Sequence, residues 1–547
     1  MISLFSSRRI CVMEASLQSF PAVNGLTPGA LLAACLALLL SVRLWLRRRG
    51  AAPGLPGPFA WPVIGNAAQL GNTPHLYCTR MARKYGDVFQ IQLGSRTVVV
   101  LNGGAIRPAL IKQGLDFAGR PDFTSFRFIA DGQSMAFGTV TDWWKTHRKV
   151  AQSTVRMFST GNPQTKRTFE QHVLAEFREL LRRFVEKTRA ERYFQPCTDL
   201  VVSTANVMSA VCFGRRYTYE DAEFREVVGR NDKFTKTVGA GSIVDVMPWL
   251  QYFPNPIKTI FEDFKNLNRD FGEFIRDKVM EHRKSMESSA IRDMTDAFIV
   301  ALDRNTETTG LSSGNDYVTP TIGDIFGASQ DTLSTALQWI ILILVKYPAI
   351  QTRLQLEVDR VVDRSRLPSI EDQAELPYVM AFLYEVMRFT SFIPLTIPHS
   401  TITDTSIMGY AIPKNTVIFI NQWSVNHDPA TWSNPGTFDP ERFLDPQGAL
   451  NKDLVANVLI FSLGRRRCIG EQLSKMQLFL FTALLAHQCR IAADPAKTLP
   501  LDYKYGLTLK PLDYAIAVSL REDVTLLDAG AAQAVTNEQS AELQAKG

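Results

Sequence analysis

The fold is decided by Phe461-Ser-Leu-Gly-Arg-Arg-Arg-Cys468-Ile-Gly470. This segment places one cysteine between two glycines and beside three arginines, directly before a strongly helical stretch from Glu471 to Cys489. Cationic side chains and the amino end of a helix both stabilise a thiolate relative to a thiol. The glycines allow a sharp turn and a close approach of the backbone to a flat ligand. The segment therefore indicates a functional cysteine, with an ordinary cysteine in a basic loop as the alternative.

The composition is that of a globular protein. Hydrophobic residues make up 46% of the 547 residues and charged residues 21%, so most of the chain can bury a core. The 60 basic residues are spread among 54 acidic ones, and the net charge is +6. This balance argues against nucleic-acid binding and favours a local basic face for an acidic protein or an anionic membrane surface.

The cysteines predict neither a disulfide framework nor a zinc site. They are odd in number, widely scattered and without a C-x-x-C pair, which places the bulk of the chain in a reducing compartment. Apart from the cysteine of the opening segment, they are expected to be inert, buried, small hydrophobic groups. The seven cysteines are residues 11, 35, 78, 197, 212, 468 and 489.

An apolar run from Gly29 to Leu46 predicts a membrane anchor. Its length approaches the about 20 residues that cross a bilayer core. Three arginines follow it, and by the positive-inside rule this end faces the cytosol. Residues 1–28 are then a lumenal segment and residues 29–46 a transmembrane signal anchor. A buried core helix is the alternative.

The remaining boundaries follow from composition. Arginines and closely spaced prolines predict a basic, semi-rigid linker over residues 47–58. Residues 523–547 are rich in alanine, glutamine and small polar residues and are expected to form a flexible tail. Neither an internal repeat nor a Gly/Ser linker divides residues 59–522, so one large domain is expected.

Helical periodicity dominates this domain, and strand-like runs are fewer and shorter. The expected fold class is therefore mainly α with small β-sheets. Helices are predicted over Phe169–Lys187, Asp263–Arg283, Gly323–Lys346, Glu375–Thr390 and Glu471–Cys489, and strands over Val88–Leu93, Thr97–Leu101 and Thr416–Ile420.

The opening segment matches F-x-x-G-x-R-x-C-x-G, the haem-binding signature of the cytochromes P-450. Five fixed positions are rarely met by accident, and the resemblance extends from the proline-rich linker to about residue 525. It implies the cytochrome P-450 fold with haem b (iron protoporphyrin IX) as cofactor. It also implies that Cys468 is the axial thiolate ligand of the haem iron and that Arg466 binds a haem propionate.

Two further segments resemble motifs of the family. Glu385-Val-Met-Arg388 matches E-x-x-R, and its spacing puts both side chains on one helix face. Phe438-Asp-Pro-Glu-Arg442-Phe matches the segment whose arginine joins that pair. Alone, a Glu/Arg pair at this spacing is common. The resemblance implies a buried, structural network of Glu385, Arg388 and Arg442.

Trp144-Lys-Thr-His-Arg148 resembles the W-x-x-x-R helix of the family, in which the indole N–H and the guanidinium hold a propionate. A buried tryptophan and a solvated arginine are the alternative. His399 follows the E-x-x-R helix, where the family often has another propionate donor. A lone histidine is more often a structural residue.

Ala328-Ser-Gln-Asp331-Thr332 resembles the oxygen-binding A-G-x-D-T pattern, with Ser329 in place of the usual glycine. A threonine in mid-helix can donate to the carbonyl four residues earlier and open the helix locally. In the family this opening lets the acid and the alcohol, with water, deliver protons for dioxygen cleavage. Asp331 and Thr332 are therefore the candidate catalytic residues, and a threonine that merely points into a core is the alternative.

Other segments resemble the aryl-hydrocarbon-inducible first family of cytochromes P-450, and its subfamily B most of all. They are Val207–Gly214, Val238–Ser242, Asp245–Pro256, Gly327–Gln338 and Asn421–Pro429. The resemblance implies a flat, apolar pocket for planar aromatic and steroid-like substrates, which aromatic rings can stack against. Each aromatic residue alone is more often core packing. The candidate lining residues are Ala136, Phe137, Phe234, Phe271, Asp324, Gly327, Ala328, Ile393 and Leu507.

The implied activity is a monooxygenase that inserts one atom of O2 into lipophilic molecules: steroids such as estradiol, polycyclic aromatic hydrocarbons, retinoids and fatty acids. The chain has no Gly-rich dinucleotide fingerprint, so its electrons come from outside. By resemblance they come from NADPH through NADPH-cytochrome P-450 reductase, with cytochrome b5 as a further partner. The expected location is the endoplasmic reticulum membrane, with the catalytic domain cytosolic, and mitochondria as a second site. Arg465, Arg467, Lys145 and Lys149 are candidates for a docking face or ordinary solubilising charge.

Two other functions stay open at this point. An electron-independent haem-thiolate isomerase or dehydratase is disfavoured by Asp331 and Thr332, because such enzymes often lack the acid/alcohol pair. A haem-based sensor or lipid carrier would bind its ligand without turnover. Consumption of NADPH coupled to a hydroxylated product separates these classes.

Overall fold

The computed structural model describes residues 27–50, 54–238, 243–286, 291–309 and 317–521. Its contacts divide the chain into two compact units, one of residues 1–121 and 398–421 and the other of residues 122–397 and 422–547. The domain predicted over residues 59–522 contains parts of both. Most of the predicted lumenal segment, the predicted tail and residues 239–242 lie outside the described residues.

The smaller unit contains a four-stranded sheet of order β1-β2-β6-β3. Strands β1 and β2 form an antiparallel hairpin that pairs residue 88 with residue 101, and β6 adds to β2 in parallel. The inner strands are apolar, which suits residues covered on both faces. The elements are α1 (Pro28–Gly50), α2 (Ala67–Leu70), α3 (Pro74–Tyr85), β1 (Val88–Leu93), β2 (Arg96–Leu101), α4 (Gly103–Arg107), η1 (Pro108–Lys112), β3 (His399–Ser400), β4 (Thr405–Ile407), β5 (Tyr410–Ile412) and β6 (Val417–Ile420).

Helix α1 contains the segment predicted to be a membrane anchor. Those of its leucines whose burial is described are exposed, with Leu32 and Leu38 each at 65%. By length and composition, one helix of the described residues could cross a membrane, namely α12 (Val318–Lys346), but 83% of its apolar window is buried inside the protein. We therefore treat α12 as a core helix, and the anchor over residues 29–46 stays a prediction.

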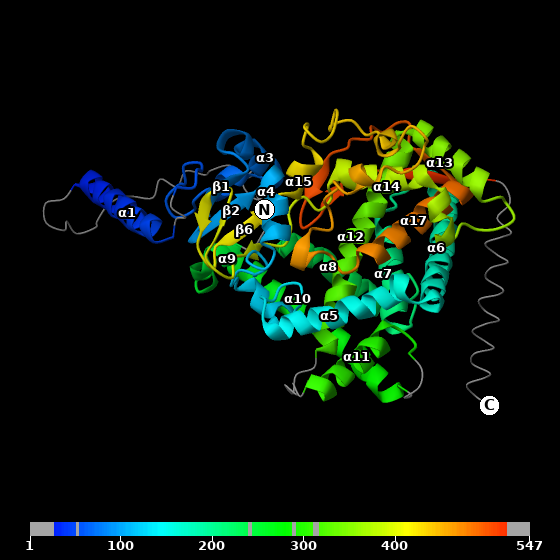
Figure 1. Cartoon of the computed structure of the whole chain (residues 1–547), viewed down its shortest axis with the longest axis horizontal. Helices are drawn as coiled ribbons and strands as arrows, with labels where there is room; N and C mark the ends of the chain where they lie inside the picture. Colours follow the sequence, from blue (N-terminus) through cyan, green and yellow to red (C-terminus); the bar gives the residue numbers. More distant parts are fainter. Residues whose placement is uncertain (1–26, 51–53, 239–242, 287–290, 310–316, 522–547) are drawn as a thin grey trace. The chain divides into compact units, whose positions relative to one another are not determined.

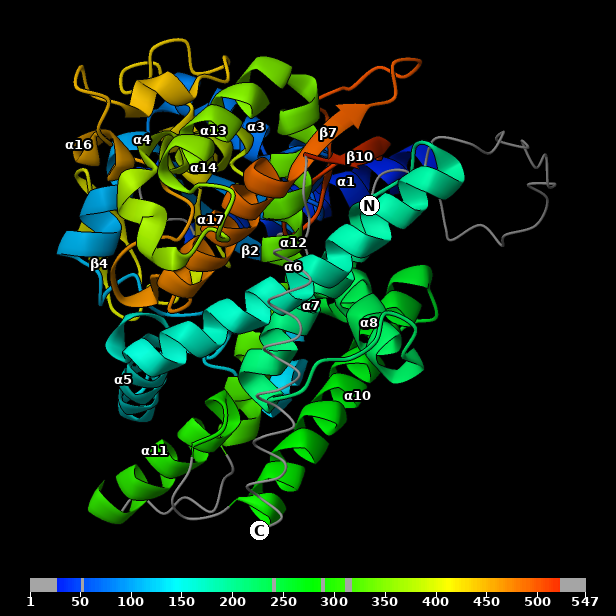
Figure 2. The same cartoon turned by 90° about the vertical axis from the view of Figure 1, so that its right-hand side faces the viewer.

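The larger unit is mainly helical. Figures 1 and 2 show α12 running through it, with contacts to α7, α10, α14 and α17. Two antiparallel ribbons, β7 with β10 and β8 with β9, complete the unit. Its elements are η2 (Ser125–Gly132), α5 (Asp142–Arg156), η3 (Met157–Gly161), α6 (Pro163–Glu191), α7 (Cys197–Phe213), α8 (Ala222–Val238), α9 (Ile243–Val246), η4 (Pro248–Gln251), α10 (Pro256–Ser285), α11 (Met294–Thr309), α12, α13 (Pro348–Val361), η5 (Ile370–Glu375), α14 (Pro377–Thr390), α15 (Gln422–Asn426), η6 (Pro440–Phe443), α16 (Lys452–Val455), η7 (Gly464–Arg466), α17 (Glu471–Gln488), β7 (Cys489–Ala493), β8 (Tyr503–Tyr505), β9 (Leu509–Pro511) and β10 (Ile516–Leu520).

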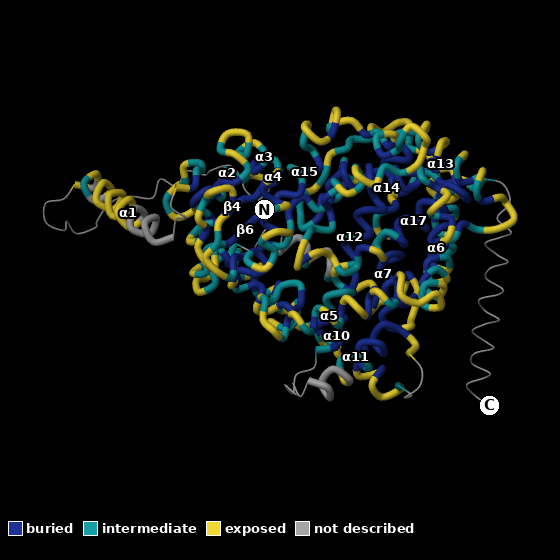
Figure 3. The backbone as a smooth tube through the Cα atoms, in the orientation of Figure 1, coloured by how far each residue is buried: buried dark blue, intermediate teal, exposed yellow. Residues whose placement is uncertain are grey.

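The two longest outer helices begin at clear local signals. Helix α6 follows Asn162 and α10 follows Asn255, and each asparagine side chain accepts a hydrogen bond from a free N–H of the first turn. A proline occupies the first helical position in both, where its missing N–H costs nothing. The core lies under these helices, and Figure 3 shows that α7, α12, α14 and α17 are largely buried.

The mainly α fold with small sheets is confirmed. Each predicted helix falls on one helix of the structure and each predicted strand on one strand. Several bounds differ. Helices α6, α10 and α12 begin before the predicted segments, β2 begins one residue earlier and β6 one residue later than predicted. Two predicted helices are too long. Helix α14 begins at Pro377 rather than Glu375, because a separate 3-10 turn precedes the proline. Helix α17 ends at Gln488, because Cys489 begins β7 and pairs with Leu520 of β10.

Candidate active site

The cysteine loop between η7 and α17 is held by backbone hydrogen bonds. The N–H of Cys468 donates to the carbonyl of Phe461 at 2.8 Å and closes the loop. Gly464 has a φ of 66°, a left-handed conformation that glycine adopts without strain. On the approach to the loop, the Asn426 side chain exchanges hydrogen bonds of 2.8 and 2.9 Å with the backbone of Leu459. The position of the sulfur is therefore fixed by the fold.

The side chain of Cys468 is exposed, whereas three other cysteines are fully buried. The surrounding protein nevertheless raises the pKa of this thiol, because desolvation outweighs the N–H of Gly470 and the charges of Arg148 and Arg467, which lower it. The arginines and the N–H at the helix end favour the thiolate, as expected, but the desolvation that opposes them is larger in the chain alone. Metal ligation deprotonates a thiol outright, so a reachable, recessed sulfur of this kind suits a metal ligand.

Trp144 of α5 lies between two arginines. The guanidinium carbon of Arg466 is 4.1 Å from the centroid of the indole ring, and that of Arg148 is 5.4 Å away. Arg148 also donates to the carbonyl of Arg467 in the cysteine loop, and the thiol of Cys468 acts electrostatically on its pKa. The structure thus brings three of the four predicted propionate-binding residues together beside the cysteine.

The same side chains hold the backbone of residues 135–138. The indole N–H of Trp144 donates to the carbonyl of Met135 at 2.9 Å. Arg466 donates to the same carbonyl at 3.0 Å and to that of Gly138 at 2.7 Å. These bonds to backbone carbonyls were not foreseen from the sequence. They give Trp144 and Arg466 a structural role, and their contact with a propionate stays a prediction.

Glu385, Arg388 and Arg442 form the buried network that the motifs implied. Arg388 donates to both oxygens of Glu385, at 2.7 and 2.8 Å, and Arg442 donates to one of them at 3.2 Å. The N–H of Asp439 donates to the same oxygen at 2.9 Å. Arg388 also donates to three backbone carbonyls. All three side chains are buried, so charge and hydrogen bonds are satisfied internally.

The predicted oxygen-binding segment forms one turn of α12. The hydroxyl of Thr332 donates to the carbonyl of Ala328 at 2.8 Å, as expected for a threonine in mid-helix. The hydroxyl of Ser329 donates to the carbonyl of Phe326 at 2.7 Å. Ala328 is exposed and Thr332 is half-buried, although most of α12 is buried. An accessible hydroxyl therefore lies on a core helix.

Asp331 has two partners that the sequence analysis did not identify. Its carboxylate lies 2.7 Å from the ammonium of Lys510 and accepts a hydrogen bond of 2.7 Å from the hydroxyl of Thr508. Both partners belong to the β8–β9 hairpin region, far along the chain. Neither motif nor periodicity pairs residues at such a separation, so no sequence signal pointed to them.

Two of the predicted substrate-lining aromatics belong to a continuous row of rings. The ring of Phe137 is 5.0 Å from that of Phe126 and 6.5 Å from that of Phe234. Phe234 in turn stacks with Phe264 at 5.8 Å. Edge and offset contacts of this kind are the favourable geometries of aromatic pairs, and further rings could join them.

Phe271 lies flat against α12. Its ring is parallel to that of Phe326, with centroids 6.4 Å apart. A methyl group added at Gly327 would lie 3.4 Å from the ring, so the glycine lets the ring approach the helix. The predicted lining residues Phe271 and Gly327 are therefore neighbours.

The carboxylate of Asp324 connects α12 to the segment that carries Phe137. It accepts hydrogen bonds from the hydroxyl of Ser134 at 2.7 Å and from the N–H of Ala136 at 3.1 Å. Desolvation raises its pKa to about 6, although these bonds and one from the N–H of Met135 lower it. Asp324 therefore holds predicted lining residues in place, beyond its own predicted contact with substrate.

This raised pKa predicts a pH-dependent stability. Folding favours the protonated carboxyl, so its contribution is complete below the unfolded pKa of 3.8 and is lost as the pH rises through about 6. We expect the unfolding free energy of the wild type to fall relative to the Asp324→Asn variant by about 3 kcal/mol between pH 4 and pH 8. Urea unfolding of both proteins between pH 4 and pH 8 measures this difference in unfolding free energy. The exposed Asp122 provides the control Asp122→Asn, and parallel curves for wild type and Asp324→Asn would contradict the assignment.

Three predicted site residues have simpler surroundings. Ile393 is half-buried, and its carbonyl accepts a hydrogen bond of 3.1 Å from Gln422. Leu507 is half-buried in the turn between β8 and β9. His399 belongs to β3 of the smaller unit, where its Nδ1 bonds the carbonyl of Phe117 at 2.8 Å. The predicted propionate role of His399 therefore stays a prediction.

Comparison with known proteins decides the family. A family model described as Cytochrome P450 matches residues 55–518. The chain belongs to the cytochrome P450 family. It is 55% identical over 490 residues to Cytochrome P450 1B1 of Homo sapiens, across 88% of this chain and 90% of that protein. It is 43% identical over 463 residues to Cytochrome P450 1A1 of Oryctolagus cuniculus, across 83% and 89%. The predicted likeness to the first family, and to subfamily B within it, is confirmed.

A solved structure confirms the P450 fold. A zebra fish cytochrome P450 determined with progesterone matches with a TM-score of 0.71 and 30% sequence identity, and the match covers 82% of this chain and 99% of that one. Membership of the family makes this protein a haem-dependent monooxygenase that acts on small molecules and receives electrons from a redox partner.

The described residues fit a haem. The sulfur of Cys468 is reachable and fixed by its loop. Arg148 supplies positive charge close to it, as a propionate-bearing macrocycle requires. Ala328 and Thr332 give α12 an accessible face of small side chains. We therefore assign the group to the neighbourhood of the cysteine loop as a proposal, developed below.

Proposed function

We propose that this P450 inserts one oxygen atom into planar aromatic and other lipophilic substrates, namely steroids such as estradiol, polycyclic aromatic hydrocarbons, retinoids and fatty acids. The observation that carries the proposal is the acid/alcohol pair of α12. Thr332 offers a half-buried hydroxyl beside the exposed Ala328, and the adjacent Asp331 is a buried carboxylate with a cationic partner. A protein that only binds its ligand would need no hydroxyl and carboxyl side by side for proton delivery.

Each residue of the site has a separate proposed role. Cys468 holds the haem iron through its sulfur, and Arg148, with Trp144 and Arg466 beside it, faces the propionates. When bound, the haem supplies dioxygen activation, which a thiolate ligand promotes. Asp331 and Thr332 hold and move the protons that this activation consumes. The hydroxyl of Thr332 already donates to the carbonyl of Ala328, the bond that can open a helix locally.

The aromatic rows support a flat substrate. The row through Phe137 and Phe234, and the pair of Phe271 with Phe326, offer ring faces and edges to a ligand. Planar ligands gain from such contacts beyond the area that they bury. Gly327 has no side chain and Ala328 has only a methyl group, so this part of α12 leaves room for a flat molecule. Ala136, Asp324, Ile393 and Leu507 complete the proposed lining.

The decisive experiment supplies NADPH and microsomal P450 reductase to the purified protein, with estradiol or a polycyclic aromatic hydrocarbon. Hydroxylated product that accounts for the NADPH consumed supports the proposal. A reducible haem that binds these compounds and forms no product would favour a carrier or sensor. Product formed without NADPH would favour an isomerase or dehydratase.

A change at Thr332 tests the proton path. We expect Thr332→Ala to lower the yield of product per NADPH about tenfold while hydrogen peroxide rises. Without the hydroxyl, protons are no longer delivered from a fixed position, so more of the reduced oxygen leaves as peroxide. Thr332→Ser keeps a hydroxyl and should retain most of the yield. Measurement of NADPH, product and peroxide in the same reaction checks this. Full coupling in Thr332→Ala would remove Thr332 from the path.

We also propose that the basic side chains around the cysteine loop receive the reductase and cytochrome b5. Arg465, Arg467, Lys145 and Lys149 are all exposed. Two of them already have acidic neighbours, since Arg467 donates to Glu471 and Lys145 to Asp142. The exposed pair of Lys145 with Asp142 is weak and exchanges readily, so Lys145 stays available to an acidic partner. Arg467 pairs with the buried Glu471, so the proposed face depends mainly on Arg465, Lys145 and Lys149.

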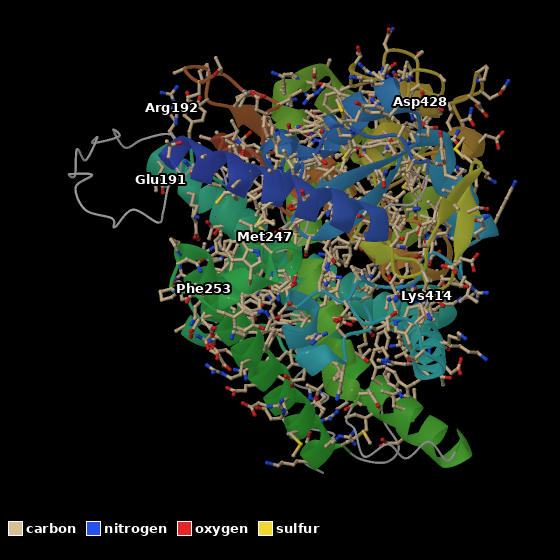
Figure 4. The ribbon with its side chains drawn as sticks, turned by 90° about the vertical axis from the view of Figure 1, so that its left-hand side faces the viewer. Glu191, Arg192, Met247, Phe253, Lys414 and Asp428 are labelled. Carbon is tan, nitrogen blue, oxygen red and sulfur yellow. The ribbon has the colours of Figure 1, made fainter. Side chains whose placement is uncertain are left out.

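We propose, finally, that the protein sits on the endoplasmic reticulum membrane through residues 29–46. The exposed leucines of α1 would be covered by lipid. In the larger unit, η4 exposes Trp249 and the segment after it exposes Tyr252 and Phe253, and Figure 4 shows Phe253 projecting outward. Aromatic residues of this kind favour the membrane interface. Microsomal fractionation of the full chain tests the location, with mitochondria as the second compartment.

A further inference from the structure

The carboxylate of Asp331 lies where strand β9 docks on α12. The hydroxyls of Thr335 and Thr508 are 3.2 Å apart, and the indole N–H of Trp339 donates to the carbonyl of Leu509 at 2.7 Å. Residues 331, 335 and 339 recur every four positions, so they lie on one side of the helix. The strand therefore follows this side of α12 and brings Lys510 to a fixed place beside Asp331.

Both oxygens of Asp331 are held from this strand. Oδ1 lies 2.7 Å from Nζ of Lys510, and Oδ2 accepts the hydroxyl of Thr508 at 2.7 Å. Two contacts at different oxygens define the rotation of the carboxylate as well as its position. The carboxylate is thereby oriented before any ligand or dioxygen binds.

Burial differs between the two partners. The side chain of Asp331 is 5% exposed, whereas that of Lys510 is 24% exposed. A carboxylate so deeply buried is costly as an anion unless a cation accompanies it. Lys510 supplies that cation and at the same time extends toward solvent. The pair therefore connects the interior of the larger unit with water.

We propose that Lys510 is a positioning residue for proton delivery: it orients the carboxylate of Asp331 and places a cation beside it, at a point where solvent can reach the pair. The proposal deepens the function proposed above and rests on it. In one turnover the carboxylate accepts a proton that solvent beside Lys510 supplies as hydronium; a water molecule is left behind and the carboxyl becomes neutral. It then releases that proton toward the site and returns to the anion paired with the ammonium, so charge and protons balance.

A purely structural role is the competing explanation, because ion pairs also fasten strands to helices. The β8–β9 hairpin offers a matched control. Lys504 pairs with Asp513 at 3.1 Å, and both side chains are about 60% exposed. The change Lys504→Met removes a lysine from the same hairpin without touching Asp331.

The test compares Lys510→Met, Lys510→Arg and Lys504→Met in the full-length, haem-loaded protein. We expect all three to keep the thiolate-type spectrum of the reduced carbon-monoxide complex. Lys510→Met should lower product per NADPH about tenfold, raise peroxide, and increase the solvent deuterium isotope effect on turnover, with KM for the substrate unchanged. Lys510→Arg should retain the coupling of NADPH use to product because it keeps the charge. Lys504→Met should have the coupling and isotope effect of the wild type.

A thermal double-mutant cycle gives a readout that does not depend on turnover. The shifts of the unfolding midpoint for Lys510→Met and Asp331→Asn should not add in the double variant, because each change breaks the same pair. Should Lys510→Met fail to incorporate haem, Lys510→Gln replaces it, since it removes the charge and keeps a hydrogen-bond donor.

The outcomes distinguish an error in the role of Lys510 from an error in the proposed monooxygenase function. If Lys510→Met loses thermal stability but keeps wild-type coupling and isotope effect, while Asp331→Asn uncouples, Lys510 is only structural and this inference is wrong. If Asp331→Asn itself remains fully coupled, the proton path through Asp331 is wrong, and the role of Lys510 that rests on it is wrong as well.

Discussion

Replacing Cys468 by alanine is expected to abolish the red-shifted Soret band of the reduced carbon-monoxide complex, together with all NADPH-dependent product. That band requires a thiolate opposite carbon monoxide. The sulfur is held by the loop closure from Cys468 to Phe461 and is reachable from outside. The variant may be expressed with added haem and examined by absorbance after reduction under carbon monoxide. Loss of the ligand removes the electron density that promotes cleavage of dioxygen, so activity should fall to background.

A second cysteine serves as the control. Cys197 opens α7 and is partly buried, and desolvation raises its pKa to about 11, so it is a neutral thiol. Cys197→Ala should keep both the band and the turnover. Persistence of the band in Cys468→Ala would mean that another residue ligates the iron, and the assignment of the axial ligand would be wrong.

The cysteine loop could be predicted from the sequence because its chemistry is local. Ten consecutive residues carry the glycines, the arginines and the cysteine, and the following helix begins at once. The long amphipathic helices were predictable for the same reason, since α6 and α10 alternate apolar and polar faces within a few turns.

Helix α7 and the distant partners of the site residues could not be predicted in this way, although the buried helices α12, α14 and α17 were predicted. Helix α7 is buried on nearly all sides, including Ser203 and Ser209, so it has no apolar stripe that periodicity detects. The partners of Asp331 and the carbonyl acceptors of Trp144 depend on how separate segments pack. The net rise of the Cys468 pKa could not be predicted for a related reason, because desolvation comes from the whole surrounding fold.

The Glu385→Gln variant is expected to lose about 3–5 kcal/mol of stability, because it leaves two buried guanidinium groups without their counter-charge. Arg388 is fully buried and Arg442 nearly so, and both donate to Glu385. The amide of glutamine can accept through one oxygen only, whereas the carboxylate accepts four hydrogen bonds from three residues. Urea unfolding of the haem-loaded protein measures the loss, and a low yield of haem protein should accompany it.

An exposed pair gives the matched control for this change. Glu441 bonds Arg353 with both side chains about half exposed, and Glu441→Gln should cost less than about 1 kcal/mol. Equal losses for the two variants would contradict the buried network. Because Glu385 acts through packing and not on the substrate, the fraction of Glu385→Gln that retains haem should turn over at nearly the wild-type rate per haem. A folded variant with normal stability and lost turnover would instead place Glu385 in the catalytic machinery.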